Sequence, residues 1–144
     1  MLTSSLTGKS VIVTGGSKGI GKAVARTLAT EGCDVVVAAR TQSVLEATAQ
    51  ELSRETGRRI EPVVVDTGDD ESVRAMVARA VELLGGVDIV VNSAAQPLGQ
   101  GAPPKLADVT TEAFWADVNV KAMGYLRCAQ AVAPHMAAQH WGRI

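Results

Sequence analysis

The chain reads Thr14-Gly15-Gly16-Ser17-Lys18-Gly19-Ile20-Gly21 where a short apolar run ends and a helical pattern begins. Glycines at a strand-to-helix turn allow positive φ and let a pyrophosphate approach the backbone. The helix behind the turn supplies free N–H groups and a partial positive charge. A plain tight turn would contain the same glycines, but the strand before it, the helix after it and further βα units favour a dinucleotide-binding turn.

The rest of the chain alternates short apolar runs with longer helical patterns. Strands are predicted at 10–14, 35–39, 60–65 and 87–91, with helices between them that begin near Ile20, Ser43 and Asp69. The second helix opens on Ser43-Val44-Leu45-Glu46, which has the form of a capping box. Strands that are nearly all apolar indicate a parallel sheet covered on both faces. The predicted fold class is α/β, a Rossmann-type doubly wound parallel sheet in a single domain over residues 1–144.

A long helix is predicted after the fourth strand and a loop rich in glycine and proline. Thr110 or Thr111 caps this helix, which extends to about Met136 with Pro134 as a kink or early end. Its apolar positions include Phe114, Val118, Ala122 and Leu126. The chain stops at Ile144, two residues into a predicted fifth strand, so we expect the sheet to be incomplete at its C-terminal end.

Composition excludes several classes of function. The 144 residues carry a formal net charge of −1 at pH 7, which gives no electrostatic footprint for nucleic acid or an anionic membrane. Cys33 and Cys128 lie far apart with no histidine cluster beside them, so neither a metal site nor a disulfide framework is expected. The apolar runs are too short to span a bilayer, and reduced thiols fit a cytoplasmic location.

Four motifs in this order resemble the short-chain dehydrogenase/reductase family. They are the Gly-x-x-x-Gly-x-Gly turn after Thr14, Asp66 just past the third strand, Asn92-Ser93-Ala94-Ala95 after the fourth, and Asn119 in the long helix. The resemblance implies that Asp66 bonds the adenine of the cofactor and that Asn119 belongs to the family's catalytic tetrad. Ser93 and Ala95 depart from the family's usual Asn-Asn-Ala-Gly, so we expect altered hydrogen bonding beneath the cofactor.

The choice between cofactors follows from charge at the end of the second strand. An NAD site needs a carboxylate there to accept the ribose 2′-OH, but this chain has Ala39 followed by Arg40. A guanidinium can pair with a 2′-phosphate in two parallel hydrogen bonds. Lys18 in the glycine turn adds a second cation. Together these residues favour NADP (NADPH) over NAD.

The family transfers hydride with a Tyr-x-x-x-Lys pair and a serine at the end of strand five, and the resemblance implies that all three are missing from this chain. Its one tyrosine, Tyr125, is followed four residues later by Ala129, and Lys121 precedes it in the reversed order. The resemblance therefore implies the N-terminal part of an NADP-dependent oxidoreductase that acts on a small carbonyl or alcohol. The alternative is a short chain that binds nucleotide or a partner without catalysis. A homo-oligomer through the helix at 111–136 is also implied.

These arguments yield one candidate catalytic residue, Asn119. The candidate cofactor-binding residues are Gly15, Ser17, Lys18, Gly19, Ile20, Gly21, Arg40, Asp66, Thr67, Asn92 and Ala94.

Overall fold

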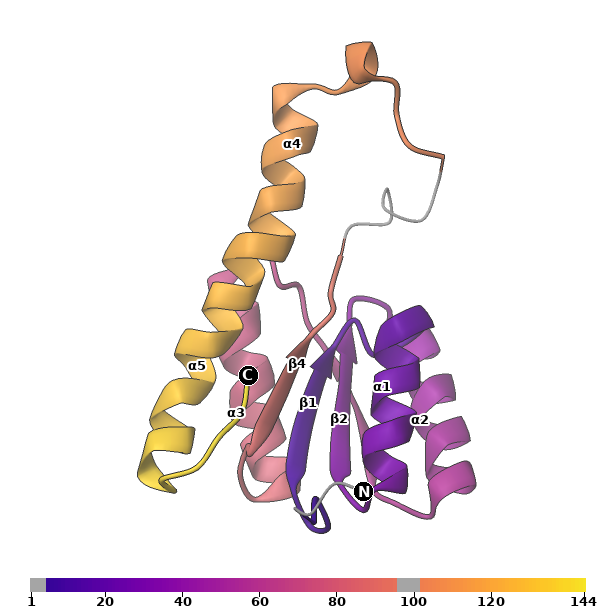
Figure 1. The fold of residues 1–144 in the computed structure, drawn as a ribbon, viewed down its shortest axis with the longest axis vertical. Coiled ribbons are helices and arrows are strands. Elements are labelled where there is room, and N and C mark those ends of the chain that lie inside the picture. Colours follow the sequence, from indigo (N-terminus) through magenta and orange to yellow (C-terminus); the bar gives the residue numbers. More distant parts are fainter. Residues whose placement is uncertain (1–4, 96–101) are drawn as a thin grey trace.

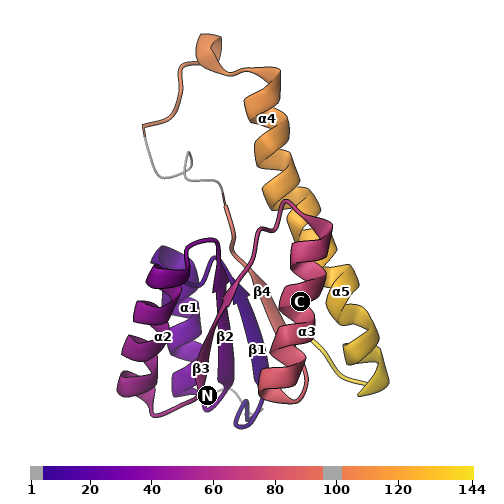
Figure 2. The same cartoon turned by 180° about the vertical axis from the view of Figure 1, so that it is seen from behind.

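The computed structural model describes residues 5–95 and 102–144, so the first part of the predicted loop at 96–108, residues 96–101, lies outside the described residues. Four parallel strands form one sheet in the order β3-β2-β1-β4. Helices α1 and α2 cover one face and α3 and α5 the other (Figures 1 and 2). The elements are β1 (Ser10–Thr14), α1 (Gly19–Thr30), β2 (Asp34–Ala39), α2 (Gln42–Thr56), β3 (Ile60–Val64), α3 (Asp70–Leu84), β4 (Ile89–Asn92), the 3-10 turn η2 (Leu106–Asp108), α4 (Thr111–Val118), the π-helix η3 (Asn119–Met123) and α5 (Gly124–Ala138).

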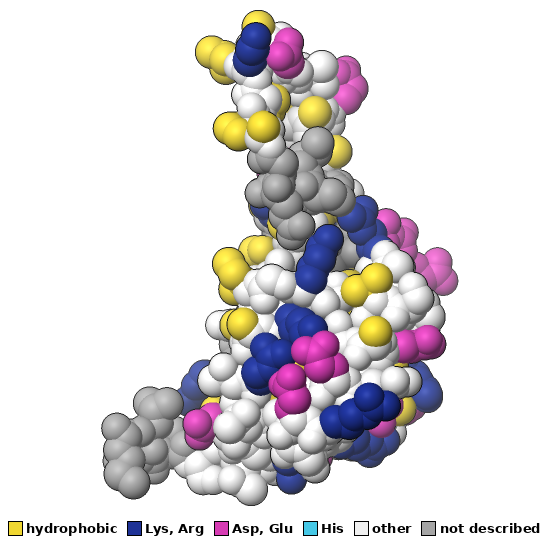
Figure 3. All heavy atoms as spheres, turned by 90° about the vertical axis from the view of Figure 1, so that its right-hand side faces the viewer, with side chains coloured by type: hydrophobic (Ala, Val, Ile, Leu, Met, Phe, Trp, Pro, Cys, Tyr) yellow, Lys and Arg dark blue, Asp and Glu magenta, His cyan; other side chains and the backbone are white. Residues whose placement is uncertain are grey.

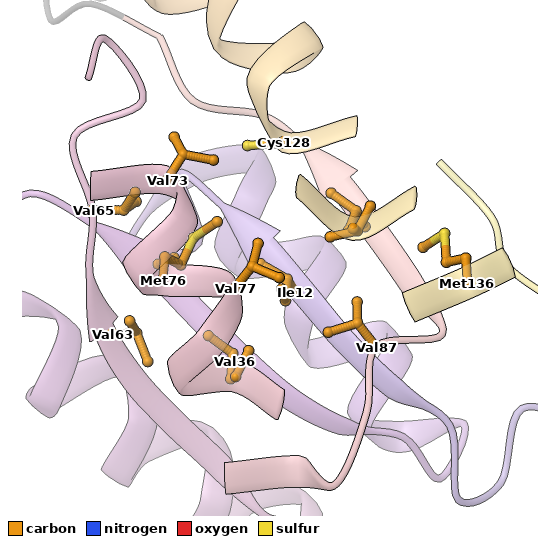
Figure 4. Close-up of a cluster of buried hydrophobic side chains, with 14 residues drawn as sticks. Ile12, Val36, Val63, Val65, Val73, Met76, Val77, Val87, Cys128 and Met136 are labelled. Atoms are coloured by element: carbon orange, nitrogen blue, oxygen red, sulfur yellow. The ribbon is translucent and has the colours of Figure 1, made fainter. Parts of the chain in front are cut away.

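Two hydrophobic cores sandwich the sheet because successive strand side chains point to opposite faces. On one face, Ile12 and Val36 pack with Val73 and Met76 of α3 and with Cys128 of α5 (Figure 4). On the other face, the neighbouring strand residues pack against α1 and α2. Strand residues buried from both sides confirm the predicted doubly covered parallel sheet, with strand bounds that differ by at most two residues from those expected.

Local signals in the sequence explain where most helices begin and end. The Asp69 side chain accepts a hydrogen bond of 2.6 Å from Ser72 N and caps α3, while Thr110 accepts from Ala113 N and caps α4. Gly57 and Gly85 end α2 and α3 in the left-handed conformation.

The predicted capping box at Ser43 is wrong. Helix α2 begins at Gln42 with Thr41 as its N-cap residue, and this cap makes no side-chain hydrogen bond. Ser43 is therefore already inside the helix. Glu46 instead accepts a hydrogen bond from Gln42 across one helical turn.

The long helix differs from the prediction in two ways. The π-helix η3 separates α4 from α5, and Pro134 lies within α5 without ending it. The expected apolar stripe is not the buried one, since Phe114 and Leu126 are exposed, whereas α5 buries Gly124, Cys128, Val132 and Met136. Helix α4 extends beyond the end of the sheet, so no core lies beneath it (Figure 1).

After α5 the chain returns to the free edge of β4. Arg143 forms a parallel bridge with Ile89, in which Val90 N donates to Arg143 O at 3.0 Å. Asp88 holds this end of the sheet together, because it accepts hydrogen bonds from Ser10 N and Lys9 Nζ. The chain thus begins to pair where the sequence predicted a fifth strand.

The surface over α1 and α2 is covered by interspersed charges of both signs (Figure 3). Lys22 and Arg26 of α1 form ion pairs with Glu51 and Glu55 of α2. Among the described residues, no helix is long and apolar enough to cross a membrane, and no group of side chains could hold a metal ion.

Both cysteine thiols should be unreactive in the folded protein. Cys33 and Cys128 are fully buried, and burial raises the pKa of Cys33 and raises that of Cys128 to about 11. The reactive thiolate is therefore scarce even at a pH near 8.5, where about half of an exposed thiol is ionised. Ellman's reagent should modify neither thiol in native buffer and both in urea. Rapid labelling without urea would contradict this packing.

Candidate functional site

The glycine turn lies at the carboxyl edge of the sheet, between β1 and α1. Gly15 and Gly19 have φ values of 68° and 56°, in the left-handed region that favours glycine. The N-cap residue of α1, Lys18, makes no side-chain hydrogen bond to the helix. The first N–H groups of α1 are therefore not satisfied by a capping side chain and can bind an anion.

Close packing explains why two positions of the turn are occupied by glycine. A Cβ atom at Gly15 would lie 2.6 Å from Ser93 O, and one at Gly21 would lie 2.6 Å from Ser93 Oγ while also overlapping the Gly15 carbonyl. The Ser93 hydroxyl in turn donates to Thr14 O at 2.6 Å. The turn is thus held directly against the loop that follows β4, with Ser93 in place of the family's second asparagine.

A cleft of about 520 Å³ opens in front of this turn. Ligands in open parallel sheets bind at this edge, outside the carboxyl ends of the strands. Ten of the predicted cofactor-binding residues line the cleft. They are Gly15, Ser17, Lys18, Gly19, Ile20, Gly21, Arg40, Asp66, Thr67 and Ala94. Residues that the sequence analysis did not select also line it, notably Val44, Val120 and Lys121.

Charge in the cleft is mainly positive. Lys18 and Arg40 are exposed at its rim, and neither forms an ion pair within the part of the chain that the structure describes. Lys121 also lines the cleft and pairs with Asp117 at 3.1 Å. Asp66 is the one carboxylate among the lining residues, so the cleft favours an anionic ligand.

The loop after β3 presents Asp66 and Thr67 to the cleft. One Asp66 carboxylate oxygen accepts from Gly68 N at 2.8 Å, which orients the exposed side chain. Thr67 is buried, and its hydroxyl donates to Val120 O at 3.3 Å. Thr67 therefore joins this loop to the π-helix rather than offering its hydroxyl to a ligand.

Asn92 and Asn119 do not line the cleft. The Oδ1 atom of Asn92 is buried and has no hydrogen-bond partner among the described residues. The Asn119 amide donates to Gly68 O at 3.0 Å, and its Oδ1 accepts from Arg127 Nη2 at 2.8 Å. In the π-helix, Val120 and Lys121 face the cleft instead.

Arg127 is a structural residue that the sequence analysis missed. Its guanidinium is only 16% exposed and pairs with Asp70 at the start of α3. It also donates to Thr67 O and to Asn119 O, at 3.1 and 3.0 Å. Arg127 thereby joins α5, the π-helix and the loop after β3. An arginine in a helix that is otherwise largely apolar is the only signal that could have marked it.

A second hollow, of about 510 Å³, lies between α3 and α5. It is lined mostly by apolar side chains such as Val77 and Ala131, and it does not touch the glycine turn. The cleft at the carboxyl edge is the candidate functional site because it combines exposed cations with the uncapped N-terminus of α1, whose first N–H groups can bind an anion.

The sheet order, the tight glycine turn and the uncapped helix behind it define a Rossmann-type α/β domain. The chain belongs to the short chain dehydrogenase family, whose profile matches residues 9–144. An uncharacterized oxidoreductase of Staphylococcus aureus (strain USA300) is 35% identical over 139 residues, which are 96% of this chain and 57% of the relative. The chain therefore spans a little over half the length of such curated relatives.

Solved structures show the same likeness. L-sorbose reductase from Gluconobacter frateurii, complexed with NADPH and L-sorbose, matches with a TM-score of 0.85 and 32% identity over 94% of this chain and 50% of that one. An NADP complex of a short chain dehydrogenase from Burkholderia cenocepacia matches with a TM-score of 0.81 and 34% identity, over 92% of this chain and 52% of that one. NAD+-bound xylitol dehydrogenase matches with a TM-score of 0.88 and 29% identity, over 98% of this chain and 53% of that one.

Proposed function

We propose that this chain is the cofactor-binding part of an NADP-dependent oxidoreductase that acts on a small carbonyl compound or secondary alcohol. The observation that carries the proposal is the pair of cations at the rim of the cleft, Lys18 and Arg40, together with Ala39 where an NAD site would have a carboxylate. Similar structures contain NADPH, NADP or NAD+, so cofactor choice rests on these residues of the chain itself.

The residues of the cleft fit a bound NADP. The free N–H groups at the start of α1 would hold the pyrophosphate, and the glycine turn in front of them lines the cleft. Arg40 and Lys18 would hold the 2′-phosphate, and Asp66 the adenine. Bound there, the nicotinamide ring supplies hydride transfer.

The direction of the cofactor in the cleft follows from these contacts. With the 2′-phosphate at Arg40 and the pyrophosphate at the glycine turn, the nicotinamide half would be held by Ala94, Val120 and Lys121, which also line the cleft. Asn119 is proposed as a catalytic residue by family resemblance. Its side chain is bonded to Gly68 O and Arg127, so within this chain it would act by fixing the π-helix beside the cleft.

The sequence has no Tyr-x-x-x-Lys pair, and this favours a second candidate for the 144 residues by themselves, nucleotide binding without turnover. We also propose a cytoplasmic location, since two buried free thiols fit a reducing compartment. Oligomerisation through the helix at 111–136 is supported by the exposed side chains of Phe114, Trp115 and Leu126.

Arg40→Asp is expected to reverse the cofactor preference. NADPH affinity should fall by about 100-fold, because the substitution removes a charge-assisted contact to the 2′-phosphate and adds repulsion. NADH affinity should stay within about threefold of its original value, since a carboxylate can accept the ribose 2′-OH. Fluorescence titration with both nucleotides measures the two effects.

Arg54→Asp is the matched control for this experiment. Arg54 lies in the last turn of α2, the helix that follows Arg40, and outside the cleft, so the substitution makes the same change in net charge without touching the cofactor. It should leave both affinities nearly unchanged. Equal losses of NADPH and NADH affinity in Arg40→Asp would disprove the NADP assignment.

A further inference from the structure

Tyr125, the chain's only tyrosine, connects α5 to the loop after β4. Its phenol donates a hydrogen bond of 3.2 Å to the carbonyl of Ala94, which lines the cleft. Tyr125 itself is half-buried and does not line the cleft. Its side chain therefore lies behind the wall that would face the nicotinamide half of the cofactor.

The first two residues of this loop are held differently. Ser93 is bonded to β1 through its hydroxyl and its N–H, both of which donate to Thr14 O. Ala94, one residue further on, accepts a hydrogen bond from Tyr125 alone among the described residues. The orientation of the Ala94 peptide therefore depends on the phenol.

The segment of α5 that carries Tyr125 is held in place by contacts with Thr67. Gly124 packs so closely on Thr67 that an added Cβ would lie 3.0 Å from both its carbonyl oxygen and its Cβ. Arg127, two residues after Tyr125, donates to Thr67 O. The segment is thus anchored to the loop after β3 while its phenol reaches the loop after β4, and both loops line the cleft.

We infer that Tyr125 is a positioning residue for the nicotinamide half of the cofactor, because it fixes the Ala94 carbonyl at the wall of the cleft. This inference rests on the proposed function. It assigns the phenol a role different from the proton transfer that a tyrosine performs in the family, since the hydroxyl proton is donated to a backbone carbonyl.

The test compares two ligands in Tyr125→Phe, which removes one oxygen atom and keeps the ring. Adenosine 2′,5′-bisphosphate carries the half of the cofactor assigned to Arg40, Asp66 and the glycine turn, whereas NADPH also reaches Ala94. Calorimetry should show that NADPH affinity falls about fivefold, as expected for the loss of one positioned hydrogen bond, while bisphosphate affinity is unchanged.

Thr30→Val is the matched control. It also removes a hydroxyl that donates to a backbone carbonyl, that of Arg26, on the exposed end of α1 and away from the cleft. Both affinities should be unchanged in this variant. In unliganded Tyr125→Phe, amide hydrogen exchange should speed up at residues 93–95 and remain unchanged at residues 15–21.

Other outcomes would contradict either the positioning role of Tyr125 or the proposed function. Equal losses for both ligands, no loss for either, or unchanged exchange at residues 93–95 would overturn the positioning role. The role would also fail if the unsubstituted chain bound NADPH no more tightly than the bisphosphate. Failure of the unsubstituted chain to bind either ligand would instead contradict the proposed function itself.

Discussion

Gly21→Ala is expected to abolish NADPH binding and to lower the free energy of unfolding by about 2 kcal/mol, because small-to-large substitutions at packed sites strain their surroundings. The new Cβ would overlap the Gly15 carbonyl and lie 2.6 Å from Ser93 Oγ. Both neighbours are fixed, since Gly15 N is bonded to Ala38 O and Ser93 Oγ to Thr14 O. The turn must therefore move away from the start of α1, where the pyrophosphate would bind. Urea unfolding and nucleotide titration measure the two effects.

Gly57→Ala separates the loss of the site from a general loss of stability. Gly57 ends α2 in the left-handed conformation with φ of 68°, and a Cβ there would meet nothing within 4 Å. The substitution should cost about 1 kcal/mol of stability because alanine disfavours this conformation, and it should leave NADPH affinity unchanged. Wild-type affinity in Gly21→Ala would show that the turn does not form the pyrophosphate site.

Arg127→Leu is expected to lower the free energy of unfolding by about 2 to 4 kcal/mol, since it leaves buried polar groups without partners. The carbonyls of Thr67 and Asn119 and the Oδ1 atom of Asn119 would all lose a donor. These groups join the π-helix to the loop after β3, so the wall of the cleft that carries Asp66 should loosen with them. Chemical denaturation measures the loss of stability.

Arg26→Leu provides the comparison for a surface arginine. Hydrogen bonding to Glu55 raises the pKa of Arg26, but its ion pairs with Glu51 and Glu55 are exposed to solvent. Exposed ion pairs are screened and contribute little, so this substitution should leave the free energy of unfolding almost unchanged. Similar losses in the two variants would contradict the structural role assigned to Arg127.

The sheet could be predicted from the sequence because each signal for it is local. Apolar runs between helical patterns predicted all four strands, and Gly57, Gly85, Asp69 and Thr110 marked helix ends. The glycine turn was recognisable for the same reason. The strand before its eight residues and the helix after them are local signals too, and they distinguish it from a plain tight turn.

The environment of the long helix could not be predicted in this way. The stripe through Phe114 and Leu126 is apolar, but α4, which carries Phe114, extends past the sheet and has no core to pack against. The π-helix then changes which residues face the cleft, so Val120 and Lys121 line it and Asn119 does not. A helical pattern with a regular period contains no signal for such a change.

The order of the strands has a consequence for how the domain assembles. Ser10 of β1 pairs with Asp34, whereas on the other side Val11 pairs with Ile89, much further along the chain. Closing the longer loop costs more conformational entropy, so we expect β4 to join the sheet late in folding and to separate from it early in unfolding. A dinucleotide that touches both the glycine turn and the loop after β4 would bridge the two sides of the β1–β4 pairing. Its binding would then stabilise the contact that forms last.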